Sequence, residues 1–270
     1  MRLKHLGRVV RSGVLFTALF FYLPCQSFAW GMLGHRIIGE VASSYLTGRA
    51  SREIKKILGN ETIALASNWA DFIKSDTAFR YLNPWHYLDV DKGLNAIQMQ
   101  AVLQKDTAVD AYTRLNFLIA QLKNKKLAQN EKLMYLRLLI HIVGDIHQPF
   151  HSSANGDKGG NDIKVFWFGQ SSNMHRVWDE QLIEGQDLSY TEYTRAINFT
   201  TDEQRRQWQQ SPLSNWFFDS YQISEALHKE LKQPEPKLGY EYNYLHLKTL
   251  NEQLLKGGVR LAGLLNEIFG

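Results

Sequence analysis

The sequence predicts a mainly helical, single-domain protein that carries one small β-hairpin. Apolar residues recur at helical spacing in seven segments: 37–46, 54–58, 63–73, 109–122, 134–143, 216–231 and 245–268. Only residues 162–168, D-I-K-V-F-W-F, alternate in the way that is typical of a strand. No repeat, low-complexity stretch or linker interrupts residues 30–270, which we therefore expect to form one domain.

The first 29 residues have the organisation of a secretory signal peptide. Basic residues within 2–11 precede an apolar run at 14–23, and Ser27-Phe28-Ala29 places small residues at both key positions before Trp30. The apolar run is too short to span a bilayer, which argues against a membrane anchor. We expect cleavage after Ala29, a mature domain at 30–270 and a secreted or periplasmic location.

Removal of this segment changes what the composition implies. Four of the 31 basic residues and none of the 27 acidic residues lie in 1–29, so the two charges balance in the mature chain. The net positive charge of the precursor therefore does not indicate nucleic-acid binding. The only cysteine, Cys25, is also removed. We hypothesise that bound metal helps the core to hold the mature fold together.

Turn-forming residues separate the helical segments. Thr47-Gly48, Leu58-Gly59 and Gly93 lie between apolar runs. Residues 155–161, N-G-D-K-G-G-N, predict a flexible loop before the strand. Residues 232–237, K-Q-P-E-P-K, predict a connection between the last two helices.

The segment 139–151, L-I-H-I-V-G-D-I-H-Q-P-F-H, concentrates metal-binding residue types. His141 and Asp145 stand four residues apart, which places an imidazole and a carboxylate on one face of a helix. His147 and His151 follow, with Pro149 ending the helix between them. This pattern is typical of the middle of a metal site.

Further donors lie in separate segments, and a second His-x3-Asp pair is among them. They are His35, Asp71, His86, His175 and Asp179. Imidazole nitrogens and carboxylate oxygens suit zinc, and eight such donors exceed what one tetrahedral ion can use. The alternative is that each pair is a surface or structural contact. His228 and His246 lack carboxylates at useful spacing, and we interpret them as ordinary residues.

Trp30 becomes the N-terminus if cleavage follows Ala29. Its free amine and carbonyl can then chelate an ion, whereas in the precursor the nitrogen is part of a peptide bond and that site is incomplete. The alternative is that Trp30 is only a hydrophobic first residue.

These residues resemble those of the zinc-dependent single-strand nucleases of fungi, plants and bacteria, which are bifunctional nucleases and 3′-nucleotidases. Members begin with Trp-Gly and carry three zinc ions in a helical fold of the zinc-dependent phospholipase C type. The resemblance runs from Trp30 to Phe269. The matching segments are W-G-M-L-G-H-R, N-W-A-D, W-H-Y-L-D, H-I-V-G-D-I-H-Q-P-F-H, G-G-N-D, H-R-V-W-D and R-L-A-G-L-L-N.

The resemblance implies three Zn²⁺ ions and assigns their ligands. One ion would bind Asp71, His86, His141 and Asp145. A close partner would bind the Trp30 amine and carbonyl, His35 and the second oxygen of Asp145, and the third would bind His151, His175 and Asp179. A hydroxide bridging the first two ions would be the nucleophile, and the third ion would stabilise the leaving oxyanion. His147 has no place in this scheme, and we interpret it as a supporting or structural residue.

Four more residues match the substrate-binding positions of the family. Asp71 would orient the attacking water, while Lys74 and Asn161 would stabilise the phosphate. Tyr87 would stack on a base and Asp89 would accept hydrogen bonds from the base edge. Stacking requires an unpaired base, which implies a preference for single strands. The alternatives are a core tyrosine at 87 and a solvated surface lysine at 74.

The resulting hypothesis is an exported endonuclease that cleaves single-stranded DNA and RNA to 5′-phosphorylated products and also has 3′-nucleotidase activity. We expect a monomer without stable membrane association after signal cleavage. A phospholipase C-like phosphodiesterase is the main alternative, although that pattern ends the second pair in Glu rather than Asp179. An exported zinc-binding protein is the non-enzyme alternative, but it would give Lys74 and Asn161 no role.

Overall fold

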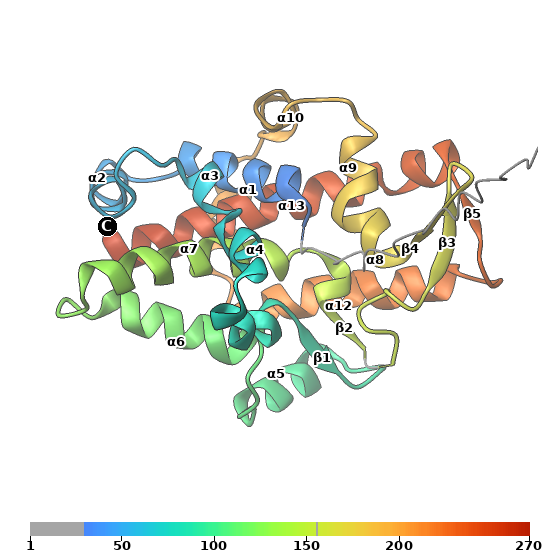
Figure 1. Ribbon diagram of the computed structural model, residues 1–270, viewed down its shortest axis with the longest axis horizontal. Helices are drawn as coiled ribbons and strands as arrows, with labels where there is room; N and C mark the ends of the chain where they lie inside the picture. The colour runs from blue at the N-terminus through green and yellow to red at the C-terminus, as the bar shows by residue number, and fades with distance from the viewer. Residues whose placement is uncertain (1–29, 155) are drawn as a thin grey trace, which may run out of the picture.

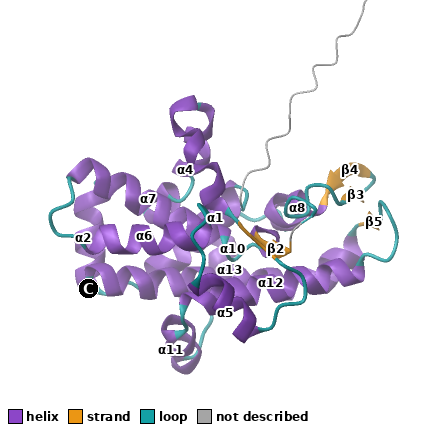
Figure 2. Ribbon diagram, turned by 90° about the horizontal axis from the view of Figure 1, so that it is seen from below, coloured by secondary structure: helices purple, strands orange, loops and turns teal. Residues whose placement is uncertain are grey.

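The computed structural model describes residues 30–154 and 156–270 (Figure 1). The signal peptide expected at 1–29 therefore lies outside the described residues. The prediction of a mainly helical protein is confirmed, because helices account for most of the described chain and the strands are few and short (Figure 2).

The α-helices follow the predicted apolar periodicity closely at both ends of the chain. They are α1 Met32–Ser44, α2 Gly48–Leu58, α3 Ile63–Ala66, α4 Trp69–Phe72, α5 Ala96–Gln104, α6 Ala111–Lys123, α7 Gln129–Asp145, α8 Met174–Arg176, α9 Leu182–Glu184, α10 Tyr190–Ile197, α11 Asp202–Gln210, α12 Leu213–Glu230 and α13 Tyr240–Phe269.

Short 3₁₀ segments and one π-helix among the described residues connect several of these α-helices. The 3₁₀ segments are η1 Ile73–Ser75, η2 Thr77–His86 and η3 Pro149–His151, and the π-helix is η4 Val177–Gln181. The strands are β1 Leu88–Val90, β2 Ser152–Ala154, β3 Lys164–Trp167, β4 Gln170–Asn173 and β5 Lys237–Leu238.

Helix α13 runs along the length of the molecule and packs against α1 (Figure 1). The two helices approach closely because position 258 has no side chain, and a β-carbon there would lie 2.4 Å from atoms of Val41. Buried leucine, isoleucine and valine side chains fill the space between these helices and α7. This apolar core is the support on which the ligand-bearing helix ends are fixed.

Two small sheets lie beside the bundle. The predicted hairpin is present as β3 and β4, which pair antiparallel with Trp167 opposite Gln170. The sequence did not indicate that β5 adds to β3 in parallel, or that β1 pairs with β2 in parallel. Both additions join segments far apart in the chain, so local alternation could not predict them.

The predicted helix at 63–73 is wrong in one respect, because it is broken into α3, α4 and η1. Asn68 lies at the break and is fully buried. Its side-chain oxygen accepts a hydrogen bond from Arg36 Nε at 2.9 Å, and its nitrogen donates to the Met32 carbonyl at 3.2 Å. Tertiary partners on α1 therefore override the helical periodicity here.

Within residues 30–154 and 156–270, no helix combines the length and the apolar character that a bilayer crossing requires.

Candidate metal centre and substrate pocket

Helix α7 supplies two predicted ligands from one face. His141 and Asp145 are buried one turn apart at its C-terminal end, and His141 Nε2 lies 3.3 Å from Asp145 Oδ2. The helix ends at Asp145, four residues before Pro149. Pro149 instead begins η3, which carries His151 beyond the end of the helix.

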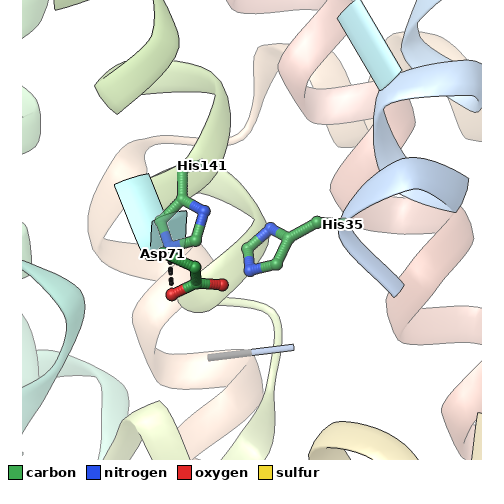
Figure 3. A group of neighbouring side chains, drawn as sticks. All are labelled: His35, Asp71 and His141. Carbon is green, nitrogen blue, oxygen red and sulfur yellow. Dashed lines mark ion pairs between the residues drawn. The ribbon is translucent and has the colours of Figure 1, made fainter. Parts of the chain in front are cut away.

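Helix α1 brings His35 against the same face of α7. The rings of His35 and His141 stack with centroids 4.0 Å apart, and His35 Nε2 lies 3.3 Å from Asp145 Oδ1. A β-carbon at Gly144 would lie 2.6 Å from His35 Nδ1, so this approach requires glycine. Figure 3 shows His35 and His141 converging on the Asp71 carboxylate from different helices.

Asp71 and Lys74 reach this centre from α4 and η1. Asp71 is buried, and its Oδ1 lies 3.7 Å from His141 Nε2. Lys74 Nζ donates a hydrogen bond to the same oxygen at 2.7 Å. Burial opposes ionisation of Asp71, but its neighbours His141, Lys74 and His35 outweigh burial and lower its pKa. The carboxylate is therefore ionised at neutral pH.

His86 links this cluster to the next one. Its Nδ1 lies 2.9 Å from Asp145 Oδ2 and 3.1 Å from His141 Nε2. Strand β1 begins two residues later and pairs with β2, which follows His151 directly. His151 Nδ1 donates to the His86 carbonyl at 2.8 Å. The β1–β2 pairing thus holds two groups of ligands side by side.

The remaining group combines η3 with the α8–η4 segment. His175 Nε2 lies 2.9 Å from Asp179 Oδ2, and His151 Nε2 lies 3.8 Å from Asp179 Oδ1. Gln148 Nε2 donates a short hydrogen bond to Asp179 Oδ1. Burial disfavours the imidazolium form of His175, but the charge of the Asp179 carboxylate outweighs burial and raises the pKa of His175.

The structure therefore places all eight predicted His and Asp ligands in three buried groups. Within each group the ligand atoms lie within 4.8 Å of one another. His141 belongs to two groups, so five of the residues form one contiguous cluster. The groups are His35, Asp71 and His141; His86, His141 and Asp145; and His151, His175 and Asp179.

Unpartnered polar atoms show that these residues fit cations. Several buried ligand atoms have no hydrogen-bond partner among the described residues, whereas buried polar atoms almost always have one. The orphaned ligand atoms are His35 Nδ1 and Nε2, Asp71 Oδ2, His86 Nε2, Asp145 Oδ1, His151 Nε2 and Asp179 Oδ2. Nitrogen and carboxylate donors without a thiolate suit zinc.

Backbone carbonyls orient three of the imidazoles. The Nδ1 atoms of His141, His151 and His175 lie 2.6, 2.8 and 2.6 Å from the carbonyl oxygens of Ser67, His86 and Gly159. A carbonyl can only accept, so each Nδ1 carries the proton. In the neutral ring each Nε2 then keeps its lone pair for the centre, which is the arrangement of metal-binding histidines.

Burial also gives the centre the electrostatics of a cation site. It lowers the pKa of His35 to about 4 and those of His86 and His151 well below the ordinary value, so these rings are neutral. Burial raises the pKa of Asp145 to about 8. Without a cation this carboxyl group would be protonated at neutral pH, whereas a divalent ion favours its ionised form.

A cavity of about 650 Å³ opens beside both clusters, lined by His86, His151 and His175. The four predicted substrate residues also line it: Lys74, Tyr87, Asp89 and Asn161. Tyr87 is 43% exposed, so it is not a core tyrosine. The Lys74 side chain is 18% exposed and points to Asp71, so it is not a solvated surface lysine.

Sequence reasoning missed four polar pocket residues, Ser75, Arg80, Asn83 and Lys158. Arg80, Asn83 and His86 all lie on η2 at intervals of three residues. A 3₁₀-helix has about three residues per turn, so these side chains share one face. The interval was visible in the sequence, but it identifies a face only once the segment is known to be 3₁₀.

Trp30 is fully buried, and its side chain folds back onto Gly34, one residue before His35. The Gly31 amide donates to the Asp179 carbonyl at 2.7 Å. The start of the described chain is thus fixed between α1 and η4, next to ligands of both clusters. This placement is consistent with the expected chelating role, which stays a prediction.

His147 has structural partners and belongs to none of the ligand groups. Its Nδ1 donates to the Val143 carbonyl at 2.7 Å, and its Nε2 lies 3.1 Å from Arg260 Nη1. Arg260 Nη2 donates to Asp219 Oδ2 at 2.5 Å. This buried network ties the chain after α7 to α12 and α13.

The two histidines interpreted as ordinary each face a carboxylate from a distant part of the chain. His246 Nε2 lies 3.1 Å from Glu230 Oε2. His228 Nε2 forms a short ion pair with Asp157, which lies in the loop that borders the pocket. Neither pair could be predicted from the sequence, because neither partner stands at helical spacing.

Known nucleases are similar in sequence to this chain over most of its length. The family model described as S1/P1 Nuclease matches residues 30–270. The chain is 28% identical to Endonuclease 3 of Arabidopsis thaliana, with 98% of this chain and 97% of that protein covered. It is 31% identical to Nuclease S1 of Aspergillus oryzae over 62% of this chain and 59% of that protein. It is 26% identical to Nuclease P1 of Penicillium citrinum, with 89% and 98% covered.

Proposed function

The chain belongs to the S1/P1 nuclease family, and we propose on that premise that it is a zinc-dependent endonuclease for single-stranded DNA and RNA. Family membership makes it a hydrolase of phosphodiester bonds. The finer proposal is that it binds three Zn²⁺ ions, releases 5′-phosphorylated products and also removes the phosphate of 3′-nucleotides.

One observation carries the proposal: the buried ligand groups open into a pocket whose polar lining suits a nucleotide. Lys74, Arg80 and Lys158 supply positive charge to the pocket, and Asp89 is the one acidic residue among the described residues that line it. Exposed Tyr87 offers an aromatic face next to His86. A cationic pocket with an aromatic platform suits a phosphate joined to an unpaired base.

The residues of the chain divide the catalytic work. Zinc, when bound, would supply Lewis-acid chemistry and lower the pKa of water. Asp71, ionised and held by Lys74, would orient the attacking water. Lys74 and Asn161 would bind the phosphate and neutralise its charge. Tyr87 and Asp89 would hold the base by stacking and by accepting hydrogen bonds at its edge.

Maturation is part of the same proposal. Cleavage of a signal peptide after Ala29 would export the domain 30–270 and free the Trp30 amine. The buried position of Trp30, close to His35, supports a ligand role for the new N-terminus. We propose that the mature protein acts as a monomer outside the cytoplasm.

The test uses protein that begins at Trp30. Zinc per chain is counted, and hydrolysis of single-stranded DNA is followed for the wild type and for Asp71→Asn. The substitution keeps the shape of the side chain but removes the charge that orients water. We expect about three zinc ions in the wild type and a loss of activity of about 100-fold or more in the variant.

A matched control is Asp187→Asn, because Asp187 is exposed and its positive φ of 53° suits asparagine. It should keep full activity. Zinc without cleavage of nucleic acid, but with hydrolysis of choline lipids, would instead support the phospholipase C-like alternative. Protein without zinc would refute the proposed metal centre.

A further inference from the structure

Residues 156–161, here called the glycine loop, border the pocket in an unusual backbone conformation. Three successive residues have positive φ, namely Lys158 at 53°, Gly159 at 62° and Gly160 at 80°. Lysine rarely adopts such angles, and a strained residue persists only where its surroundings fix it. Contacts outside the loop must therefore hold it in place.

The loop is pressed against Phe150, the neighbour of the ligand His151. A β-carbon on Gly159 would lie 2.5 Å from the Phe150 carbonyl oxygen, and one on Gly160 would lie 2.7 Å from its ring. The Gly159 carbonyl also accepts the hydrogen bond from His175 Nδ1 at 2.6 Å. The position of this loop thus determines how a ligand imidazole is oriented.

Asp157 anchors the loop internally. Its Oδ1 accepts from the Gly160 amide at 2.9 Å, and its carbonyl accepts from the Asp162 amide at 3.0 Å. These bonds close the turn, but they do not attach it to the body of the protein.

A further attachment of the loop to the body of the protein is the pair of Asp157 with His228 from α12. His228 Nε2 meets Asp157 Oδ2 in a short hydrogen-bonded ion pair, and His228 Nδ1 lies 2.7 Å from the Ser224 carbonyl. A carbonyl and a carboxylate both accept, so both ring nitrogens must donate and the ring is an imidazolium. Its ring also packs on Phe150, with centroids 5.5 Å apart.

We infer that Asp157 and His228 form a positioning pair that fixes the glycine loop against Phe150, and thereby sets Asn161 and His175 for substrate binding. The inference rests on the proposed nuclease function of the same pocket. Neither residue touches the substrate, so the pair acts through the loop.

The charges around the pair give it a pH dependence. The hydrogen bond that His228 donates to Asp157 raises the pKa of His228 most, burial opposes this rise, and the charge of Glu225 adds to it. On the other side, Lys92 also stabilises the Asp157 carboxylate, and Asp89 faces it with like charge. Because the pKa in the fold lies above 6.5, the pair is fully formed below that pH and is lost as pH rises through the shifted pKa.

The experiment compares zinc-loaded wild type with His228→Gln and His228→Lys from about pH 5.5 to about pH 8.5. KM and kcat are measured on a single-stranded oligonucleotide, and hydrogen–deuterium exchange is measured for the loop. For the wild type we expect KM to rise at high pH while kcat changes little. His228→Gln should raise KM by about tenfold or more at low pH, which is the net contribution of one charge-assisted hydrogen bond.

His228→Gln should also remove the pH dependence of KM and speed exchange in the loop, whereas His228→Lys, which stays charged, should keep KM low at high pH. Asp157→Asn should reproduce the glutamine variant. The control is His246→Gln, which removes a second His–carboxylate pair and should leave KM and loop exchange unchanged.

Loop exchange and KM that do not change in His228→Gln and Asp157→Asn would overturn the inference. Equal effects in His246→Gln would also overturn it, because they would show a general loss of stability. If the protein cleaves no nucleic acid, the proposed function fails, but the exchange measurement still decides whether the pair holds the loop.

Discussion

Gly144 illustrates how single residues determine the geometry of the metal centre. Alanine is the better helix former by about 1 kcal/mol, so a helical glycine with free space around it should be improved by substitution. Here the added methyl group would lie 2.6 Å from His35 Nδ1. We predict that Gly144→Ala displaces the His35 ring, lowers the free energy of unfolding by about 1–3 kcal/mol and releases one zinc ion.

Denaturant unfolding and a zinc count check this prediction. Gly48→Ala is the control, because a β-carbon there would meet only Arg52 Nη1, at 3.5 Å. That variant should be as stable as the wild type or slightly more so, with full zinc content. Equal stability and zinc content in the two variants would contradict the assigned role of Gly144.

At the scale of elements, η2 presents Arg80 to the pocket. We expect Arg80 to contact a phosphate of the nucleic-acid strand next to the cleaved bond. Arg80 makes no hydrogen bond or ion pair with any described residue. On single strands, each neutralised phosphate contributes about 0.7 to the slope of log affinity against log salt. Arg80→Gln should therefore raise KM for an oligonucleotide and reduce the salt slope by about 0.7.

The same variant should leave hydrolysis of a 3′-mononucleotide nearly unchanged, because that substrate has no neighbouring phosphate. Arg52→Gln on α2, away from the pocket, is the control and should keep the wild-type slope. An unchanged slope in Arg80→Gln would show that this guanidinium does not reach the strand.

The elements also show which parts of the fold the sequence could predict. Long amphipathic helices such as α7 and α12 depend on local periodicity, and both were predicted. The break in 63–73 was not predicted, because it depends on a residue far away in the sequence. His141 Nδ1 donates a hydrogen bond to the Ser67 carbonyl at 2.6 Å. In a continuous α-helix the Ser67 carbonyl would instead accept a hydrogen bond from the Asp71 amide. Here the Asp71 amide donates to the Asn68 carbonyl.

A similar limit applies to the site. His141 and Asp145 could be paired from their spacing, and the resemblance to known nucleases named the other ligands. The contact of His228 with Asp157 could not be predicted, because 71 residues separate the partners and no short-range pattern records it. The β1–β2 pairing, which places His86 beside His151, is of the same kind.

At the scale of the whole molecule, the metal centre joins segments that are spread over residues 35–179 of the described chain. Its ligands come from α1, α4, η2, α7, η3, α8 and η4. With Cys25 as the only cysteine, the chain cannot form an internal disulfide. Without a cation, three buried carboxyl groups would meet there with Lys74 as the neighbouring positive charge, and such groups are costly to bury unpaired.

Zinc removal should therefore destabilise the entire fold and make its stability depend on pH in a defined way. Burial lowers the pKa of His35 to about 4. The contribution of His35 to the free energy of unfolding is therefore fully present above pH 6.5, and roughly 3 kcal/mol of it is lost as the pH falls through the lowered pKa. His86 and His151 act in the same direction. Burial raises the pKa of Asp145 to about 8, so its contribution is lost as pH rises toward that value.

The zinc-free protein should thus be most stable near pH 6.5, with Tm falling on both sides. The zinc-loaded protein should have a higher Tm throughout and no decline between pH 6.5 and about 8, because the bound cation keeps Asp145 ionised in the fold. Calorimetry before and after chelation measures both Tm profiles, and adding zinc back should restore the profile of the zinc-loaded protein. A Tm that does not change on chelation would mean that the core alone holds these seven ligand-bearing segments together.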